Sequence, residues 1–200
     1  MDSHNALQLS NNLPEDIIWK IKLDDDTQTI VWEIRNSAKK LSFGAYNFSS
    51  NCTLLQQFSF AEDWLIGLDF VYDGMIYFHG YESDFSPVHK GIIAFDLNTK
   101  AIVWQNFSIS IQQFTKSGVV VFDPKIFPRS FQLLNLKTGK VISNINLGTI
   151  PPESTIRNQI ILPQTSESEA IWDTTQTLLY KDYRINSFYQ IEEKTINQYL

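Results

Sequence analysis

The sequence predicts an all-β protein, a β-propeller-like domain of four to five blades of antiparallel strands. Three observations predict it. Aromatic residues are abundant, with 14 Phe, 8 Tyr and 5 Trp among 200 residues, and aromatic and β-branched residues suit half-buried strands. A strand–turn–strand pattern recurs at blade-like spacing. Segments such as 75–79 and 118–123 are short and bounded by turn residues, and the long periodicity of helices is absent.

The recurring unit is a five-residue turn. It reads NFSSN at 47–51, DLNTK at 96–100 and NLKTG at 135–139, so its first residues lie 49 (47 to 96) and 39 (96 to 135) positions apart. The Asp or Asn that opens the turn can accept a hydrogen bond from the backbone two residues on. The fifth residue is expected to be left-handed and to close the hairpin. Lys100 is the poorest fit there.

A second similarity supports the repeat. Residues 27–33 (TQTIVWE) resemble residues 175–181 (TQTLLYK), which lie 148 positions later (27 to 175). That offset is about four times 37, close to the mean spacing of the other units and within the range of propeller blades.

Four units follow in order. In the first, strands are expected at 17–23, 29–35, 41–46 and 53–59. In the second they are expected at 65–71, 75–81, 91–95 and 101–107, and in the third at 111–115, 118–123, 130–134 and 140–146. The fourth unit, 155–200, is the least regular, and residues 155–172 belong either to it or to a fifth blade. Residues 1–12 are expected to be a disordered tail, and residues 13–200 a single propeller-like domain.

Composition excludes several classes of protein. Hydrophobic residues make up 43% and charged residues 19%, which is typical of a folded chain. The net charge of −6 disfavours nucleic acid and anionic membranes as partners. With one cysteine, Cys52, neither an internal disulfide nor a multi-cysteine metal site can form. The polar first twelve residues are unlike a signal peptide, so we expect a cytoplasmic protein.

Two resemblances to known families bear on the fold. Residues 91–104 (GIIAFDLNTKAIVW) resemble the blade motif of quinoprotein-like, PQQ-repeat propellers, in which a strand ending in Ala-x-Asp precedes a Thr-Gly turn. Lys100 replaces the usual glycine, and the chain has room for only half of the eight blades that bind the quinone. No cofactor is therefore expected. Residues 62–67, 79–81 and 87–92 are similar to an uncharacterised bacterial family, a domain of unknown function with propeller-like sequences, which implies a fold and a bacterial origin.

The second unit carries the densest cluster of chemically capable side chains. Nine of them fall within 29 positions: Glu62, Asp63, Asp69, His79, Tyr81, Glu82, Asp84, His89 and Lys90. Two histidines near carboxylates can ligate a metal or transfer protons, but the spacing matches no catalytic or metal-binding signature. We therefore predict no catalytic and no metal site. The candidate ligand or partner site consists of Glu62, Asp63, Trp64, His79, Tyr81, His89 and Lys90.

The predicted function is a non-catalytic binding or interaction module, whose partner is a protein or a small molecule. This step rests on analogy with other propellers. One alternative is a hydrolase that uses the acid and histidine cluster at 62–90, and convergence of His79, His89 and a carboxylate would favour it. Another alternative is a half-ring completed by homodimerisation, which strand edges exposed at 17–23 or 196–200 would favour.

Overall fold

The computed structural model describes residues 17–61, 65–83, 85–150, 155–156, 164–166, 175–180, 183–192 and 195–199. These residues form strands and one 3₁₀ helix, η1 (Leu147–Thr149), and no α-helix occurs among them. Within this part of the chain, a helix long and apolar enough to cross a membrane is absent. The all-β prediction is confirmed. The predicted tail at 1–12 and the candidate residues Glu62, Asp63 and Trp64 lie outside the described residues.

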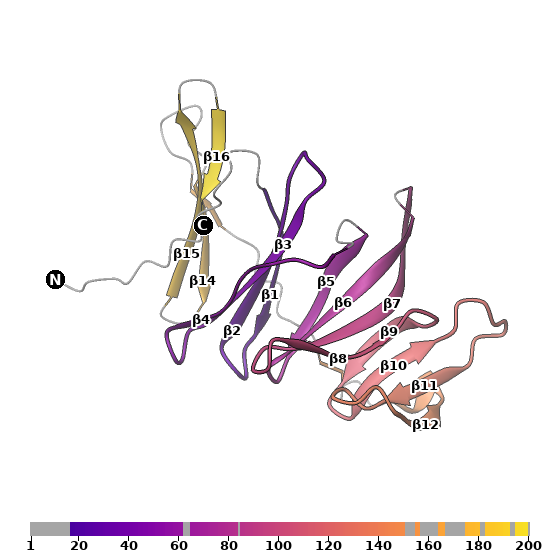
Figure 1. Cartoon of the computed structure of the whole chain (residues 1–200). Helices are drawn as coiled ribbons and strands as arrows, with labels where there is room; N and C mark the ends of the chain where they lie inside the picture. Colours follow the sequence, from indigo (N-terminus) through magenta and orange to yellow (C-terminus); the bar gives the residue numbers. More distant parts are fainter. Residues whose placement is uncertain are drawn as a thin grey trace. The chain divides into compact units, whose positions relative to one another are not determined.

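The described strands form four-stranded antiparallel sheets, each built from strands that follow one another in the chain (Figure 1). The first sheet contains β1 (Ile17–Asp24), β2 (Thr29–Arg35), β3 (Leu41–Asn47) and β4 (Cys52–Phe58). The second contains β5 (Ile66–Tyr72), β6 (Met75–Ser83), β7 (Ser86–Asp96) and β8 (Ala101–Asn106). The third contains β9 (Ser110–Thr115), β10 (Gly118–Phe122), β11 (Phe131–Leu134) and β12 (Val141–Ile145). The fourth contains β13 (Gln164–Ser166), β14 (Thr175–Tyr180), β15 (Tyr183–Glu192) and β16 (Thr195–Tyr199).

Most strand positions agree with the prediction, and one difference affects the candidate site. The strand expected at 91–95 is β7, which begins at Ser86. The β6–β7 hairpin is tight, with Ser83 opposite Ser86, so pairing extends to Tyr81 and His89. His89 was expected in a loop, and that expectation is wrong because the ladder continues through it.

The described residues of segment 155–172, which are 155–156 and 164–166, pair with two different sheets. Thr155 forms a bridge with Thr115 at the end of β9, and the backbone N–H of Ile156 donates to the carbonyl of Phe114 at 3.0 Å. Further along, β13 pairs with β14 and so belongs to the fourth sheet.

Close contacts divide the chain into two compact units. The larger comprises Lys20–Glu33 and the described part of Leu41–Gln159, and the smaller comprises the described residues of the remaining segments. The candidate site and the packing described below lie in the larger unit.

The second sheet is buried on both faces in the larger unit. One face packs against the first sheet through residues that include Phe43, Leu68 and Phe78. The other packs against the third sheet through residues that include Tyr77 and Phe114. Successive residues of β6 alternate between these two cores, because successive side chains of a strand point to opposite faces. Successive four-stranded sheets of the larger unit therefore pack face to face.

The recurring turns close their hairpins as predicted. The fifth residues, Asn51, Lys100 and Gly139, have φ angles of 52°, 54° and 65°. Lys100 therefore adopts the left-handed conformation although glycine suits it better. In the third turn the Asn135 side chain accepts hydrogen bonds from the backbone N–H groups of Lys137 and Thr138, both at 3.0 Å, and from the Thr138 hydroxyl at 3.1 Å.

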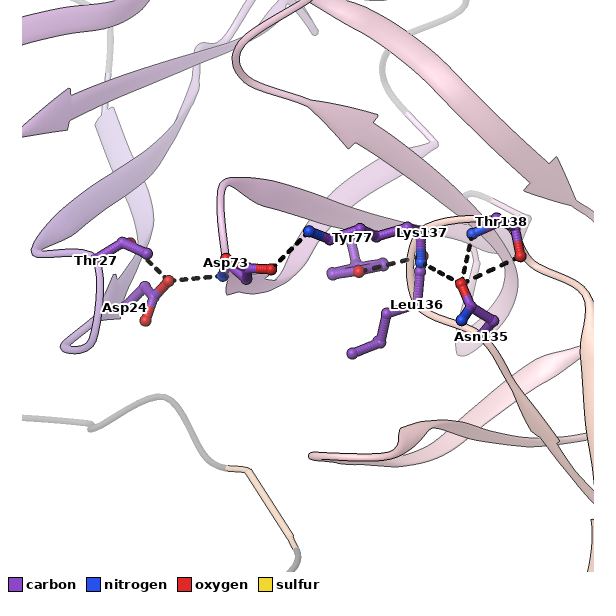
Figure 2. Close-up of polar contacts among 8 residues, drawn as sticks. All are labelled: Asp24, Thr27, Asp73, Tyr77, Asn135, Leu136, Lys137 and Thr138. Carbon is purple, nitrogen blue, oxygen red and sulfur yellow. Dashed lines mark hydrogen bonds and ion pairs between the residues drawn. The ribbon is translucent and has the colours of Figure 1, made fainter.

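A polar network links the turns of three sheets (Figure 2). Asp24, only 3% exposed, accepts hydrogen bonds from the Thr27 hydroxyl at 2.7 Å and from the backbone N–H of Asp73 at 2.9 Å. The Asp73 carboxylate pairs with Lys137 at 2.8 Å. The Tyr77 hydroxyl donates to the carbonyl of Leu136 at 3.3 Å. The third recurring turn, residues 135–139, therefore also joins the third sheet to the second.

Candidate functional site

Side chains from three neighbouring strands converge within the second sheet. Asp69 lies on β5, His79 on β6 and His89 on β7. Each offers one potential ligand atom, and these three atoms lie within 4.8 Å of one another. The sequence predicts no metal site, and these three residues are the place where that prediction can be tested.

Asp69 is placed by an irregularity in β5. The register between β5 and β6 shifts between Leu68 and Phe70, so Asp69 is an extra residue in the strand; β-bulges of this kind re-aim a side chain. Two side chains of the first sheet bind the backbone of Leu68. Its N–H donates a hydrogen bond to the Glu33 carboxylate at 2.7 Å, and its carbonyl accepts one from Lys20 Nζ at 2.9 Å. Since β5 is the first strand of its sheet, these side chains replace the missing ladder partners.

His79 is fully buried and lies over a glycine. Gly67 is its partner across β5 and β6, and a Cβ at Gly67 would approach His79 Nε2 to 2.6 Å. The glycine therefore makes room for the ring. His79 Nδ1 lies 3.6 Å from Asp69 Oδ2, beyond hydrogen-bond distance. Among the described residues, neither ring nitrogen of His79 has a hydrogen-bond partner, although buried polar atoms are normally satisfied.

His89 forms the solvent-facing side of the cluster. Its side chain is exposed, whereas the Asp69 side chain is 25% exposed. The two imidazole rings stack with centroids 3.5 Å apart and planes 8° apart. Tyr81 packs edge-on against both rings. The backbone carbonyl of His89 accepts a hydrogen bond from the Ser110 hydroxyl at 3.1 Å, which fixes this part of β7 against the third sheet.

The electrostatics keep Asp69 ionised and His89 neutral. Burial opposes ionisation of Asp69, but the neighbouring His79 and His89 rings and Lys22 outweigh it and lower the pKa of that carboxyl. Burial and then the nearby His79 lower the pKa of His89 against the opposing effect of Asp69. Burial likewise lowers the pKa of Lys22, although Asp69 opposes this. At neutral pH the cluster thus presents a carboxylate beside an imidazole whose ring nitrogen keeps a lone pair.

The structure brings together three of the predicted residues, His79, Tyr81 and His89. Lys90 pairs with Gly80, and the neighbouring pair in the ladder is Tyr81 with His89. Because successive side chains of a strand point to opposite faces, the Lys90 side chain lies on the face opposite His89. Asp69, the carboxylate that completes the cluster, was noted among nearby acids but was not chosen as a site residue. Its position inside the apolar strand IGLDFVY was the available signal, because a carboxylate is rarely buried without a partner.

A comparison with known protein families gives a match. A family described as a domain of unknown function (DUF4905) matches residues 23–104, a segment that runs from the end of β1 through most of β8 and contains Asp69, His79 and His89. Over this segment the chain is similar to that family. This agrees with the resemblance to an uncharacterised family that the sequence predicts. No curated protein matches the chain.

Proposed function

We propose that this chain is a non-catalytic binding module whose ligand-binding centre is the cluster of Asp69, His79 and His89. The observation that carries the proposal is the buried imidazole of His79, whose two nitrogens lack hydrogen-bond partners within the residues that the structure describes. Such a group costs about 1–3 kcal/mol when left unsatisfied. A ligand that bonds to it recovers that free energy, so the cluster favours the bound state.

The surroundings of the cluster suit a preformed site. The three side chains stand on consecutive strands of a sheet that is packed on both faces. Rigid strands hold binding groups more accurately than loops do, which lowers the entropic cost of binding. The exposed ring of His89 forms the solvent-facing side of the cluster and stacks on His79, so a small ligand reaches the His79 nitrogens when that one ring turns aside.

A hydrolase at the same residues is the second candidate. A histidine 3.6 Å from a carboxylate resembles a general base with its orienting acid. From the sequence we expect convergence of His79, His89 and a carboxylate if the protein is a hydrolase, and these groups do converge here. We prefer the binding module. A ligand that bonds to the His79 nitrogens is enough to explain them, whereas hydrolysis also requires a positioned substrate and nucleophile.

Native mass spectrometry and an activity assay test the proposal. The protein is measured as purified and after addition of sodium phosphate, sodium citrate or zinc chloride, beside the variant His89→Ala. We expect an added mass on the parent that the variant loses. Hydrolysis of p-nitrophenyl acetate and p-nitrophenyl phosphate is expected at the background rate. The absence of any added mass overturns the binding role, and turnover lost in Asp69→Asn shows an enzyme instead. Homodimerisation and a cytoplasmic location stay predictions.

A further inference from the structure

We infer that Asp69, His79 and His89 bind one divalent first-row transition metal ion, of which Zn²⁺ is the best representative. The inference rests on the proposed function and specifies its ligand. The three donor atoms come from β5, β6 and β7 and lie within 4.8 Å of one another. Ligands of a tetrahedral zinc ion lie about 2.0–2.2 Å from the metal and therefore about 3.3–3.6 Å from one another. The three donor atoms, which lie within 4.8 Å of one another, need only a modest contraction to reach these separations.

The buried ring of His79 is an independent indication of a ligand. Its environment excludes water from both nitrogens, and no side chain in the described part of the chain forms a hydrogen bond with either of them. The nitrogen nearest Asp69 lies 3.6 Å from the carboxylate, too far for a hydrogen bond. An ion between the two groups bonds to both, and it removes the cost of the unsatisfied nitrogen.

The donor types select the class of metal. Two imidazole nitrogens and one carboxylate oxygen suit zinc and neighbouring transition metals. Calcium and magnesium prefer all-oxygen sites with more ligands, so they are expected to bind weakly. Three protein ligands leave a fourth position for water or an external ligand. That position faces solvent, because His89 is the exposed member of the cluster.

Metal binding requires one movement. A metal lies close to the plane of each imidazole that ligates it, whereas the two rings are stacked 3.5 Å apart with planes 8° apart. Planes so nearly parallel do not meet near the two rings, so one ring must turn for both to bind the same ion. His89 is the exposed ring and His79 is enclosed, which assigns the movement to His89. The backbone of β7 stays in place because Ser110 holds the His89 carbonyl at 3.1 Å.

Isothermal titration with zinc chloride tests the site in the full chain. We expect one ion per chain, and a loss of affinity of at least tenfold in both His89→Ala and Asp69→Asn. His89 is exposed, so removing its ring leaves folding intact and the fold can be checked by circular dichroism. Lys90→Ala is the matched control: it changes the adjacent residue, which points to the other face, and should bind zinc like the parent. Cobalt(II) titration should give intense visible absorption typical of a tetrahedral site, and this absorption should be weaker in His89→Ala.

Two results would separate this inference from the proposed function. If zinc fails to bind the parent, or binds both variants as tightly as the parent, the metal site is wrong. The binding module still stands in that case if phosphate or citrate adds mass to the parent and not to His89→Ala. If zinc binds as expected and the loaded protein hydrolyses p-nitrophenyl acetate, the metal site is right and the non-catalytic role is wrong.

Discussion

The buried carboxylate of Glu33 accepts a hydrogen bond of 2.7 Å from the backbone N–H of Leu68. Glu33 is fully buried on β2, and Leu68 precedes the bulged residue Asp69 on β5. The bond therefore joins the first sheet to the second sheet. It does so at Leu68, one residue before Asp69 of the candidate site. It supplies an acceptor to an edge-strand N–H that no neighbouring strand of its own sheet can reach.

Replacement of Glu33 by alanine is expected to lower the free energy of unfolding by about 2–3 kcal/mol, because it leaves the N–H of Leu68 buried without a partner. Glu33→Gln keeps an acceptor oxygen and should lose less. Urea unfolding monitored by tryptophan fluorescence measures both variants. An alanine variant as stable as the parent would show that the Leu68 N–H finds another acceptor.

Gly67→Ala should displace the His79 ring without changing any proposed ligand. The added Cβ would lie 2.6 Å from His79 Nε2 and 2.9 Å from Cε1, so the ring must shift, at a cost of about 1–3 kcal/mol. Zinc affinity is expected to fall at least tenfold. Gly148→Ala is the control, since its nearest neighbour lies 3.5 Å from the added atom. Equal zinc affinity in the two variants would argue against His79 as a ligand.

The stability of the protein should fall as the pH rises above about 10, in part because of Tyr77. Burial and then the nearby Asp73 raise the pKa of the Tyr77 phenol above its ordinary value. The unfolded chain therefore loses this proton at lower pH than the folded chain, and stability declines with increasing pH. At pH 8 Tyr77→Phe should cost about 0.5–1.5 kcal/mol through the lost bond to Leu136. By pH 11 that difference should shrink, and denaturant titrations at the two pH values measure it.

The left-handed residues of two equivalent turns should respond in opposite directions. Gly139 has a φ of 65°, and a Cβ there would lie 2.6 Å from the Trp104 ring, so Gly139→Ala should destabilise the protein by about 1–3 kcal/mol. Lys100 has a φ of 54°, and Lys100→Gly should stabilise by about 0.5 kcal/mol by relieving backbone strain. Thermal unfolding of both variants tests the pair. If both substitutions change the stability in the same direction, the two turns are not equivalent.

The sequence by itself determined the strand–turn–strand repeat. Each of the three turns opens with an Asp or Asn whose side chain caps nearby backbone N–H groups, and each closes with a left-handed residue. These bonds span two or three residues, so the turn is specified locally. The strands of the second sheet were likewise predicted, because short apolar segments such as 75–79 are bounded by turn residues.

Only the tertiary structure decided the composition of the site. Asp69 and His89 are 20 residues apart in the sequence (69 to 89), and they meet because the β5 bulge re-aims one and the extended β6–β7 ladder carries the other. Register shifts of this kind depend on pairing between strands and on side chains such as Glu33, which reach across from another sheet. The strand propensity of individual residues cannot predict such contacts, because they form only when the sheets pack.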